Sequence, residues 1–209
     1  NSSSTERALH RMDTDMSTKS VIIVFGIILL GLVLTFWDFV SAVPISAGLM
    51  WTLVIVGVLV ALLIGFFVAA ACGYMAGLIG TSASPISGIG ILATIISSLV
   101  VYFIASENNL FATEAGVQFA TAMAIFMTSV VIAIASISND NLQDLKTGQL
   151  VGATPWRQQI ALLLGSVAGA IAIAPVLNLL YQAYGFTGAL PRAEMDPNAA
   201  LSAPQATLM

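Results

Sequence analysis

Charged residues are scarce in this chain. Of its 209 residues, six are Lys or Arg and ten are Asp or Glu, so that charged residues make up 8% of the sequence. A soluble domain usually carries about 25% charged residues. Hydrophobic residues make up 58%, which is more apolar surface than a water-soluble core of this size can hide. The composition therefore predicts an integral membrane protein.

Cysteine and histidine are almost absent as well. The single Cys72 excludes a disulfide within the chain. The single His10 has no nearby cluster of Cys, His and carboxylate side chains, which argues against a zinc- or iron-type metal site. We therefore expect no metal site and no cofactor. The few basic residues form no patch, so nucleic acid is not an expected partner.

The residues that intramembrane enzymes need are also missing. A serine protease of the membrane requires a base, and His10 lies in the polar N-terminal segment. An aspartyl protease requires two buried carboxylates, whereas Asp38 and Asp140 fall at the ends of apolar runs. No glycine-rich nucleotide-binding pattern occurs. We therefore predict that the chain is not an enzyme.

What the sequence does contain is a series of long apolar runs. They predict about five transmembrane helices, because about 20 helical residues span the hydrocarbon core. The predicted crossings are 20–36, 47–68, 86–104, 115–137 and 160–181. We expect an all-α membrane protein, a polytopic helical bundle, with Cys72, Met123 and Met127 as packing residues.

The predicted organisation has three parts. Residues 1–19 form a polar lead-in, residues 20–181 form the transmembrane helical domain, and residues 182–209 form a polar, proline-rich loop. The chain begins at Asn1 rather than Met. We therefore expect a fragment of a longer polypeptide, with 182–209 leading into the remainder.

The distribution of Lys and Arg predicts the orientation. The lead-in carries Arg7, Arg11 and Lys19, and the segment 138–159 carries Lys146 and Arg157, whereas the loops after the first and third crossings carry none. Four crossings separate the two basic segments, so both fall on one side of the membrane. By the positive-inside rule that side is the cytoplasm.

A stretch without charge between Phe39 and Ser106 predicts a turn inside the apolar region. A continuous helix of that length would be about 100 Å long, more than three times the hydrocarbon thickness. The segment 69–85 is too apolar for an aqueous loop and too rich in small and hydroxyl residues for an uninterrupted helix. We therefore predict a broken or re-entrant segment near 72–85.

This segment offers groups that could contact a substrate. Ser84 and Pro85 have the form of a helix start, with Ser84 as the N-cap and Pro85 as the first helical residue. Free backbone N–H groups and serine hydroxyls there could bind a carboxylate without a buried charge. The candidate substrate-binding residues are Gly80, Ser82, Ser84, Pro85, Ser87 and Gly88. Small residues are equally typical of tight helix packing or a plain turn, and the pattern alone favours packing.

The longest polar segment of the interior raises a similar choice. Amide and carboxylate side chains between residues 139 and 144 could face an internal cavity. The favoured interpretation is a short interfacial helix from Asp140 to Lys146 that ends at Gly148. Thr154 and Pro155 then predict the start of the last crossing.

Two long blocks resemble a known family. The blocks "CGYMAGLIGTSASPISGIGIL" (72–92) and "SISNDNLQDLKTGQLVGATPWRQQ" (136–159), together with the tail "ALPRAEMDPNAALSAPQATLM", resemble the bacterial branch of the oligopeptide transporter (OPT) family. Its members are longer, so the resemblance also implies a fragment. It implies a secondary active transporter that imports small oligopeptides or metal-chelate complexes by proton symport. It further implies the bacterial inner membrane, with the N-terminal segment in the cytoplasm.

The resemblance shifts the interpretation of single residues. It favours the substrate-facing interpretation of 80–88 over packing. The family often has Asn before the Ser-Pro pair, whereas residue 83 is Ala here. Proton coupling requires a titratable group, and Asp140 is the best candidate in this chain. The alternatives are a non-transporting membrane subunit whose Gly/Ser-rich segment packs against a partner, and a channel.

Overall fold

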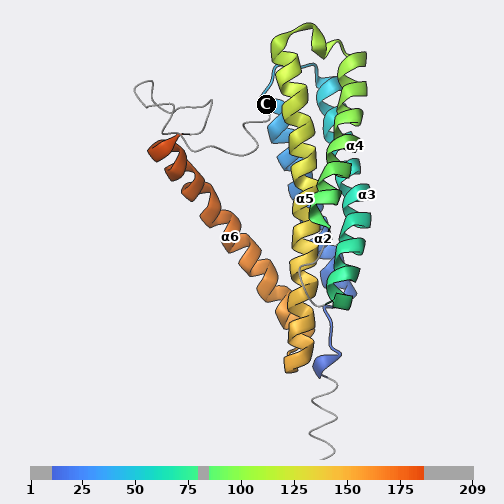
Figure 1. The fold of residues 1–209 in the computed structure, drawn as a ribbon, viewed down its shortest axis with the longest axis vertical. Helices are drawn as coiled ribbons and strands as arrows, with labels where there is room; N and C mark the ends of the chain where they lie inside the picture. Colours follow the sequence, from blue (N-terminus) through green and yellow to red (C-terminus); the bar gives the residue numbers. More distant parts are fainter. Residues whose placement is uncertain (1–10, 80–84, 186–209) are drawn as a thin grey trace, which may run out of the picture. The chain divides into compact units, whose positions relative to one another are not determined.

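The computed structural model describes residues 11–79 and 85–185, and all regular structure in these residues is helical (Figure 1). Within them, five helices are long and apolar enough to cross a membrane. They are α2 (Thr18–Ser41), α3 (Ala47–Ile79), α4 (Ile86–Glu107), α5 (Glu114–Val151) and α6 (Pro155–Tyr184), with the 3₁₀ helix η1 (Leu110–Ala112) before α5. The predicted all-α fold with about five spans is confirmed.

Two helices are much longer than predicted. α3 has 33 residues and α5 has 38, which correspond to about 50 and 57 Å of helix against a hydrocarbon core of about 30 Å. Residues 72–79 belong to α3, so the prediction of a break from 72 onward is wrong for them. α3 ends at Ile79 and α4 begins at Ile86, and residues 80–84 are outside the described residues.

Close packing on α5 explains why the small residues of 69–79 remain helical. A β-carbon on Gly73 would lie 3.3 Å from both Leu142 Cγ and Ser138 Oγ. The Ser138 hydroxyl donates a hydrogen bond of 2.8 Å to the Ala69 carbonyl. Cys72 beside them is fully buried. Small side chains here let two helix backbones approach each other, which is the packing interpretation of this part of the segment.

Contacts between side chains fix how the helices run. Gly65 and Gly73 of α3 face Ile134 and Leu142 of α5. The two pairs have the same sequence offset, so α3 and α5 run parallel and side by side (Figure 1). α4 connects them in the opposite direction, and Gly90 of α4 faces Ile132 of α5.

The ring of Phe36 fills the contact between α2, α3 and α5 in the core. Phe36 of α2 is fully buried, and its ring packs edge-on against Phe126 at a centroid distance of 5.0 Å. The ring occupies the place that a side chain on Gly57 would fill. Met123 and Met127 are fully buried in the same cluster, as predicted.

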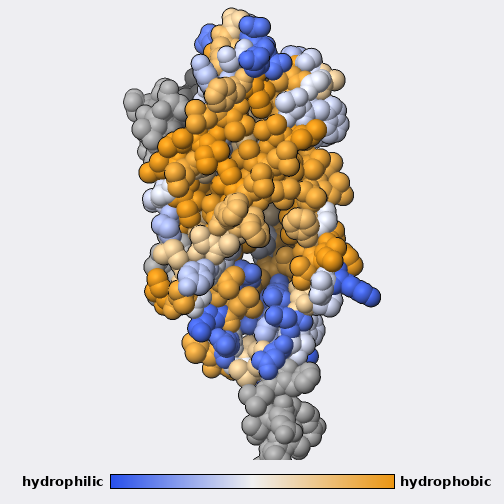
Figure 2. Space-filling model, turned by 90° about the vertical axis from the view of Figure 1, so that its right-hand side faces the viewer, coloured by the Kyte–Doolittle hydropathy of each residue, from blue (hydrophilic) through white to orange (hydrophobic). Residues whose placement is uncertain are grey.

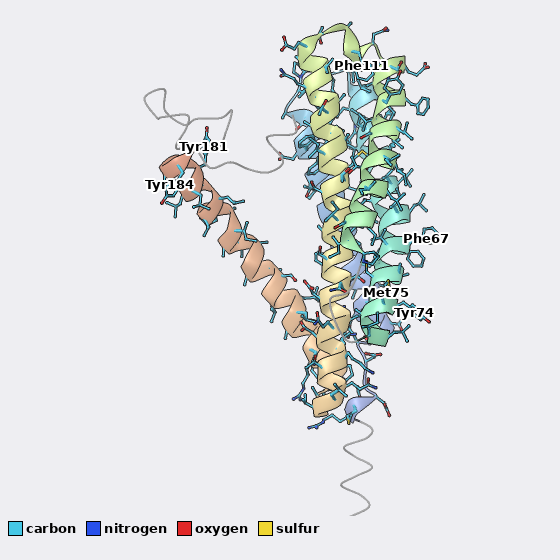
Figure 3. All side chains as sticks on the ribbon, viewed as in Figure 1. Phe67, Tyr74, Met75, Phe111, Tyr181 and Tyr184 are labelled. Carbon is cyan, nitrogen blue, oxygen red and sulfur yellow. The ribbon has the colours of Figure 1, made fainter. Side chains whose placement is uncertain are left out.

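The outer surface is apolar, as expected of a protein in lipid. On the face drawn in Figure 2, hydrophobic side chains form a broad band, with hydrophilic side chains gathered above and below it. Phe67 and Tyr74 project outward from α3, and each is 70% exposed (Figure 3). Large exposed apolar and aromatic side chains are typical of helices that meet lipid or further helices.

One buried hydroxyl in α4 gives a stability prediction. Ser97 is fully buried, and its Oγ has no hydrogen-bond partner among the described residues. An unsatisfied buried polar group costs about 1–3 kcal/mol. We expect Ser97→Ala to raise the unfolding free energy of the full-length protein in detergent by about 1 kcal/mol, measured by thermal and denaturant unfolding.

Thr128→Val is the matched control for Ser97→Ala. Thr128 is 7% exposed, and its hydroxyl donates a 2.8 Å hydrogen bond to the Ala124 carbonyl. Because this hydroxyl is satisfied, its removal brings no gain in stability. Any loss of stability from Ser97→Ala, or an equal gain from Thr128→Val, would contradict the prediction.

Candidate functional site

The N-terminus of α4 holds those candidate residues that the structure describes. The helix begins at Ile86, and Pro85 is its N-cap, with φ −77° and ψ 57°. The prediction that Pro85 is the first helical residue is wrong by one position, because this ψ lies outside the helical region. The N-cap residue Pro85 makes no side-chain hydrogen bond to the N-terminus of α4. Gly80, Ser82 and Ser84 lie outside the described residues.

The first turn of α4 is open. Ser87 and Gly88 are both exposed. A β-carbon on Gly88 would meet no heavy atom within 4 Å. The first N–H groups of a helix have no partner within the helix, and they carry its partial positive charge. This turn can therefore receive either a ligand or a helix from outside the described residues.

The position of α4 along the bundle brings this turn near the polar part of α5. α4 has 22 residues, or about 33 Å, so that its N-terminus lies at one end of a full crossing. Gly90 faces Ile132 in the antiparallel neighbour. Counting back from this contact, Ile86 lies level with about residue 136, about one helical turn from Asp140.

Asp140 itself is an exposed carboxylate on α5. Its Oδ1 accepts a hydrogen bond of 3.4 Å from Nδ2 of Asn139, which is 1% exposed. Asn139 is the one buried residue among the amide and carboxylate residues of 139–144. These side chains therefore do not share an internal cavity within the described residues. Within the described residues, Asp140 forms no hydrogen bond with the first turn of α4.

The predicted helix at 140–146 is present, but its predicted end is wrong. It is the last part of α5, which continues through Gly148 to Gly152, a left-handed C-cap with φ 74°. Gly148 is buried, and a β-carbon there would overlap the side chain of Gln158. The amide of Gln158 donates a 3.3 Å hydrogen bond to the Asp144 carbonyl. Gly148 thus makes room for a tertiary contact and does not end the helix.

The lead-in lies against the α5–α6 turn. Three hydrogen bonds join them: Arg11 Nη2 to the Gly152 carbonyl (2.9 Å), the Trp156 N–H to the Thr14 carbonyl (3.3 Å), and Gln159 Nε2 to Asp15 Oδ1 (3.4 Å). Their partners are about 140 residues apart in sequence. The two basic segments therefore lie at one end of the bundle, as the distribution of Lys and Arg predicts. We call the region formed by residues 11–15 and 142–159 the polar end.

A cavity that the sequence patterns did not predict opens at the polar end. Its volume is about 360 Å³. Its lining includes Met12, Asp15, Gly77, Leu142, Lys146 and Gln149. These residues come from three separate parts of the chain, and no local motif joins them. The contacts of residues 11–15 with the α5–α6 turn hold Asp15 at the side of α5.

Comparison with known proteins gives the family. The family model described as "OPT oligopeptide transporter protein" matches residues 1–209. A protein of Haemophilus influenzae named "Putative oligopeptide transporter" is 56% identical over 204 residues, which cover 98% of this chain and 32% of that protein. The chain thus spans about a third of the length of this relative. No solved structure matches. With five apolar helices of membrane-spanning length in its described part, the chain is an integral membrane protein that belongs to the oligopeptide transporter family.

Proposed function

We propose that the chain is part of a secondary active transporter that imports small oligopeptides or metal-chelate complexes by proton symport. It would act with the remaining helices of a longer protein in the bacterial inner membrane, with its N-terminal segment in the cytoplasm. The observation that carries the proposal is the open first turn of α4, which begins about one helical turn from an exposed carboxylate on α5, in a chain of the oligopeptide transporter family.

The substrate would meet the N-terminus of α4. Its unpaired N–H groups and the Ser87 hydroxyl are donors for a peptide carboxylate. Gly88 leaves open space beside them. The proposed set is completed by Pro85 and by Gly80, Ser82 and Ser84, which precede the helix directly. No buried cation is needed, because the helix terminus supplies the partial charge.

Uptake by the full-length protein in proteoliposomes tests this site. The assay measures initial uptake of a labelled dipeptide or a ferric chelate under an imposed pH gradient. We expect Ser87→Leu and Ser84→Leu to lower this uptake about tenfold or more, because each replaces a hydroxyl that donates a charge-assisted hydrogen bond with a large apolar side chain. Ser129→Leu is the matched control, since Ser129 is exposed on α5 and its hydroxyl donates a hydrogen bond to the Ile125 carbonyl of the same helix. Normal uptake in both site variants would disprove the site. An initial uptake rate that is the same with and without the pH gradient would disprove proton symport.

Asp140 is the proposed proton carrier. It lies about one helical turn from the start of α4, and it accepts a hydrogen bond from the neutral amide of Asn139. We expect Asp140→Asn to abolish accumulation driven by the pH gradient while substrate exchange across the membrane continues. Asp144→Asn, one helical turn further along α5, is the control. Gradient-driven accumulation at the wild-type level in Asp140→Asn would refute the assignment.

A second candidate is a non-transporting subunit of a membrane complex. The observation that favours it is the close packing of 69–79 on α5 through Gly73, Ser138 and Ala69, which shows that small residues of this region serve helix contacts. Absence of uptake for every peptide and chelate tested, together with stable copurification of a membrane partner, would support this candidate over the transporter.

A further inference from the structure

The cavity at the polar end carries two opposite charges. Asp15 comes from the lead-in and Lys146 from α5, and both line the cavity. Among the described residues, each makes a hydrogen bond to a neutral amide. Lys146 Nζ bonds Gln149 Oε1 at 3.2 Å, and Asp15 Oδ1 bonds Gln159 Nε2 at 3.4 Å. An ammonium group has three donors and a carboxylate has several acceptor sites, so both retain bonding capacity.

The rest of the lining suits a small amphipathic molecule. Met12 and Leu142 provide apolar wall, and Gly77 leaves open space, because a β-carbon there would meet no heavy atom within 4 Å. The volume of about 360 Å³ lies at the lower end of the range of about 300–1,000 Å³ for ligand sites. Apolar walls with a few fixed polar groups are typical of such sites.

We propose that this cavity is a second binding site on the substrate path, which takes a short zwitterionic peptide. The ligand's ammonium pairs with Asp15, its carboxylate pairs with Lys146, and an apolar side chain lies against Met12 and Leu142. The chemistry follows from the two charges. A purely anionic ligand would face Asp15, a purely cationic one would face Lys146, and only a ligand with both charges satisfies both. The inference rests on the proposed function and adds a site near the cytoplasmic opening.

Deletion of charge on the ligand and on the protein tests the pairing. The full-length protein in nanodiscs is titrated with labelled alanyl-leucine, N-acetyl-alanyl-leucine, which lacks the ammonium, and alanyl-leucinamide, which lacks the carboxylate. In wild type we expect each derivative to bind about tenfold more weakly, the scale of one charge-assisted hydrogen bond. In Asp15→Asn the acetyl derivative and alanyl-leucine should bind with equal affinity. In the double variant Lys146→Gln, Ser87→Leu, which also lacks the proposed carboxylate donor of α4, the amide and the parent should bind alike.

Matched controls separate pairing from general damage. Asp13→Asn, two residues before Asp15, and Lys19→Gln should discriminate between the three ligands as wild type does. Gly77→Leu should weaken all three, because its side chain enters the open space, whereas Gly31→Leu on an exposed part of α2 should not. Equal affinity of wild type for the three ligands would overturn the inference. So would a result in which Asp15→Asn and Lys146→Gln each weaken all three ligands alike.

The inference and the proposed function fail in different ways. Normal peptide binding and uptake in Asp15→Asn and Lys146→Gln, with uptake lost in Ser87→Leu, would overturn the second site and leave the transporter proposal in place. If wild type binds alanyl-leucine through both charges but takes up none of it, the second site stands and the transporter proposal is overturned.

Discussion

Replacement of Gly57 by Leu is expected to cause the largest loss of stability in this chain. A β-carbon at Gly57 would lie 2.7 Å from Cδ1 of Phe36, and still closer to the neighbouring ring carbon. The ring cannot move away, because Phe36 is fully buried and packs on Phe126. Overpacking of a filled core costs about 1–3 kcal/mol, and we expect at least about 3 kcal/mol for a whole isobutyl group at this site. Denaturant unfolding of the full-length protein in detergent measures it.

The ring of Phe36 provides a direct check. In a double-mutant cycle, Phe36→Ala should recover part of the loss of Gly57→Leu, because it vacates the volume that the new side chain needs. Gly31→Leu is the control, since a β-carbon on Gly31 meets nothing within 4 Å. Strict additivity of Gly57→Leu and Phe36→Ala would show that the two side chains do not compete for space.

The second large effect is expected at the start of α5. A β-carbon on Gly116 would overlap the carbonyl oxygen of Leu110 and lie 2.8 Å from its carbonyl carbon. Both atoms are backbone, so no rotamer change relieves the contact. Gly116 also donates its N–H to the Thr113 hydroxyl at 3.1 Å, the bond that caps α5. We expect Gly116→Ala to displace η1, weaken this cap and lower the unfolding free energy by about 2 kcal/mol.

Gly48→Ala is the matched substitution for Gly116→Ala. Gly48 lies in the first turn of α3, and a β-carbon there meets nothing within 4 Å. Ala in place of Gly in a helix stabilises by about 0.5–1 kcal/mol when space permits. The two Gly→Ala changes should therefore have opposite signs in thermal unfolding of the full-length protein. Stabilisation by both would show that η1 adapts without cost.

Hydrophobic run length predicted the fold well and the helix ends poorly. The apolar runs located all five spans, since burial in lipid demands about 20 apolar residues. They missed the last 14 residues of α5, from Ser138 to Val151, because that part is polar and is held by contacts outside the apolar run. Gly148 was misread as a helix end because the sequence does not show that Gln158 packs against it.

The candidate site was predictable only where local chemistry defines it. Ser84 and Pro85 indicate a helix start, and α4 begins one residue after Pro85. The cavity at the polar end depends instead on Asp15 and Lys146, which no pattern of spacing connects. They share a cavity because Arg11 and Thr14 bond the α5–α6 turn. Contacts between residues so far apart in sequence leave no local signal.

The last helix has a consequence for how the protein is made. α6 has 30 residues, and Arg157 is its one charged residue, so the free energy for its insertion into the bilayer can come from its own side chains. Its Leu, Ile and Val residues each favour insertion by about 0.3–0.6 kcal/mol near the helix centre. Gln182 Nε2 donates to Asn178 Oδ1 at 3.3 Å, so two of its amides partly satisfy each other, which lowers the cost of removing them from water. The translocon can therefore release α6 into lipid as an independent segment.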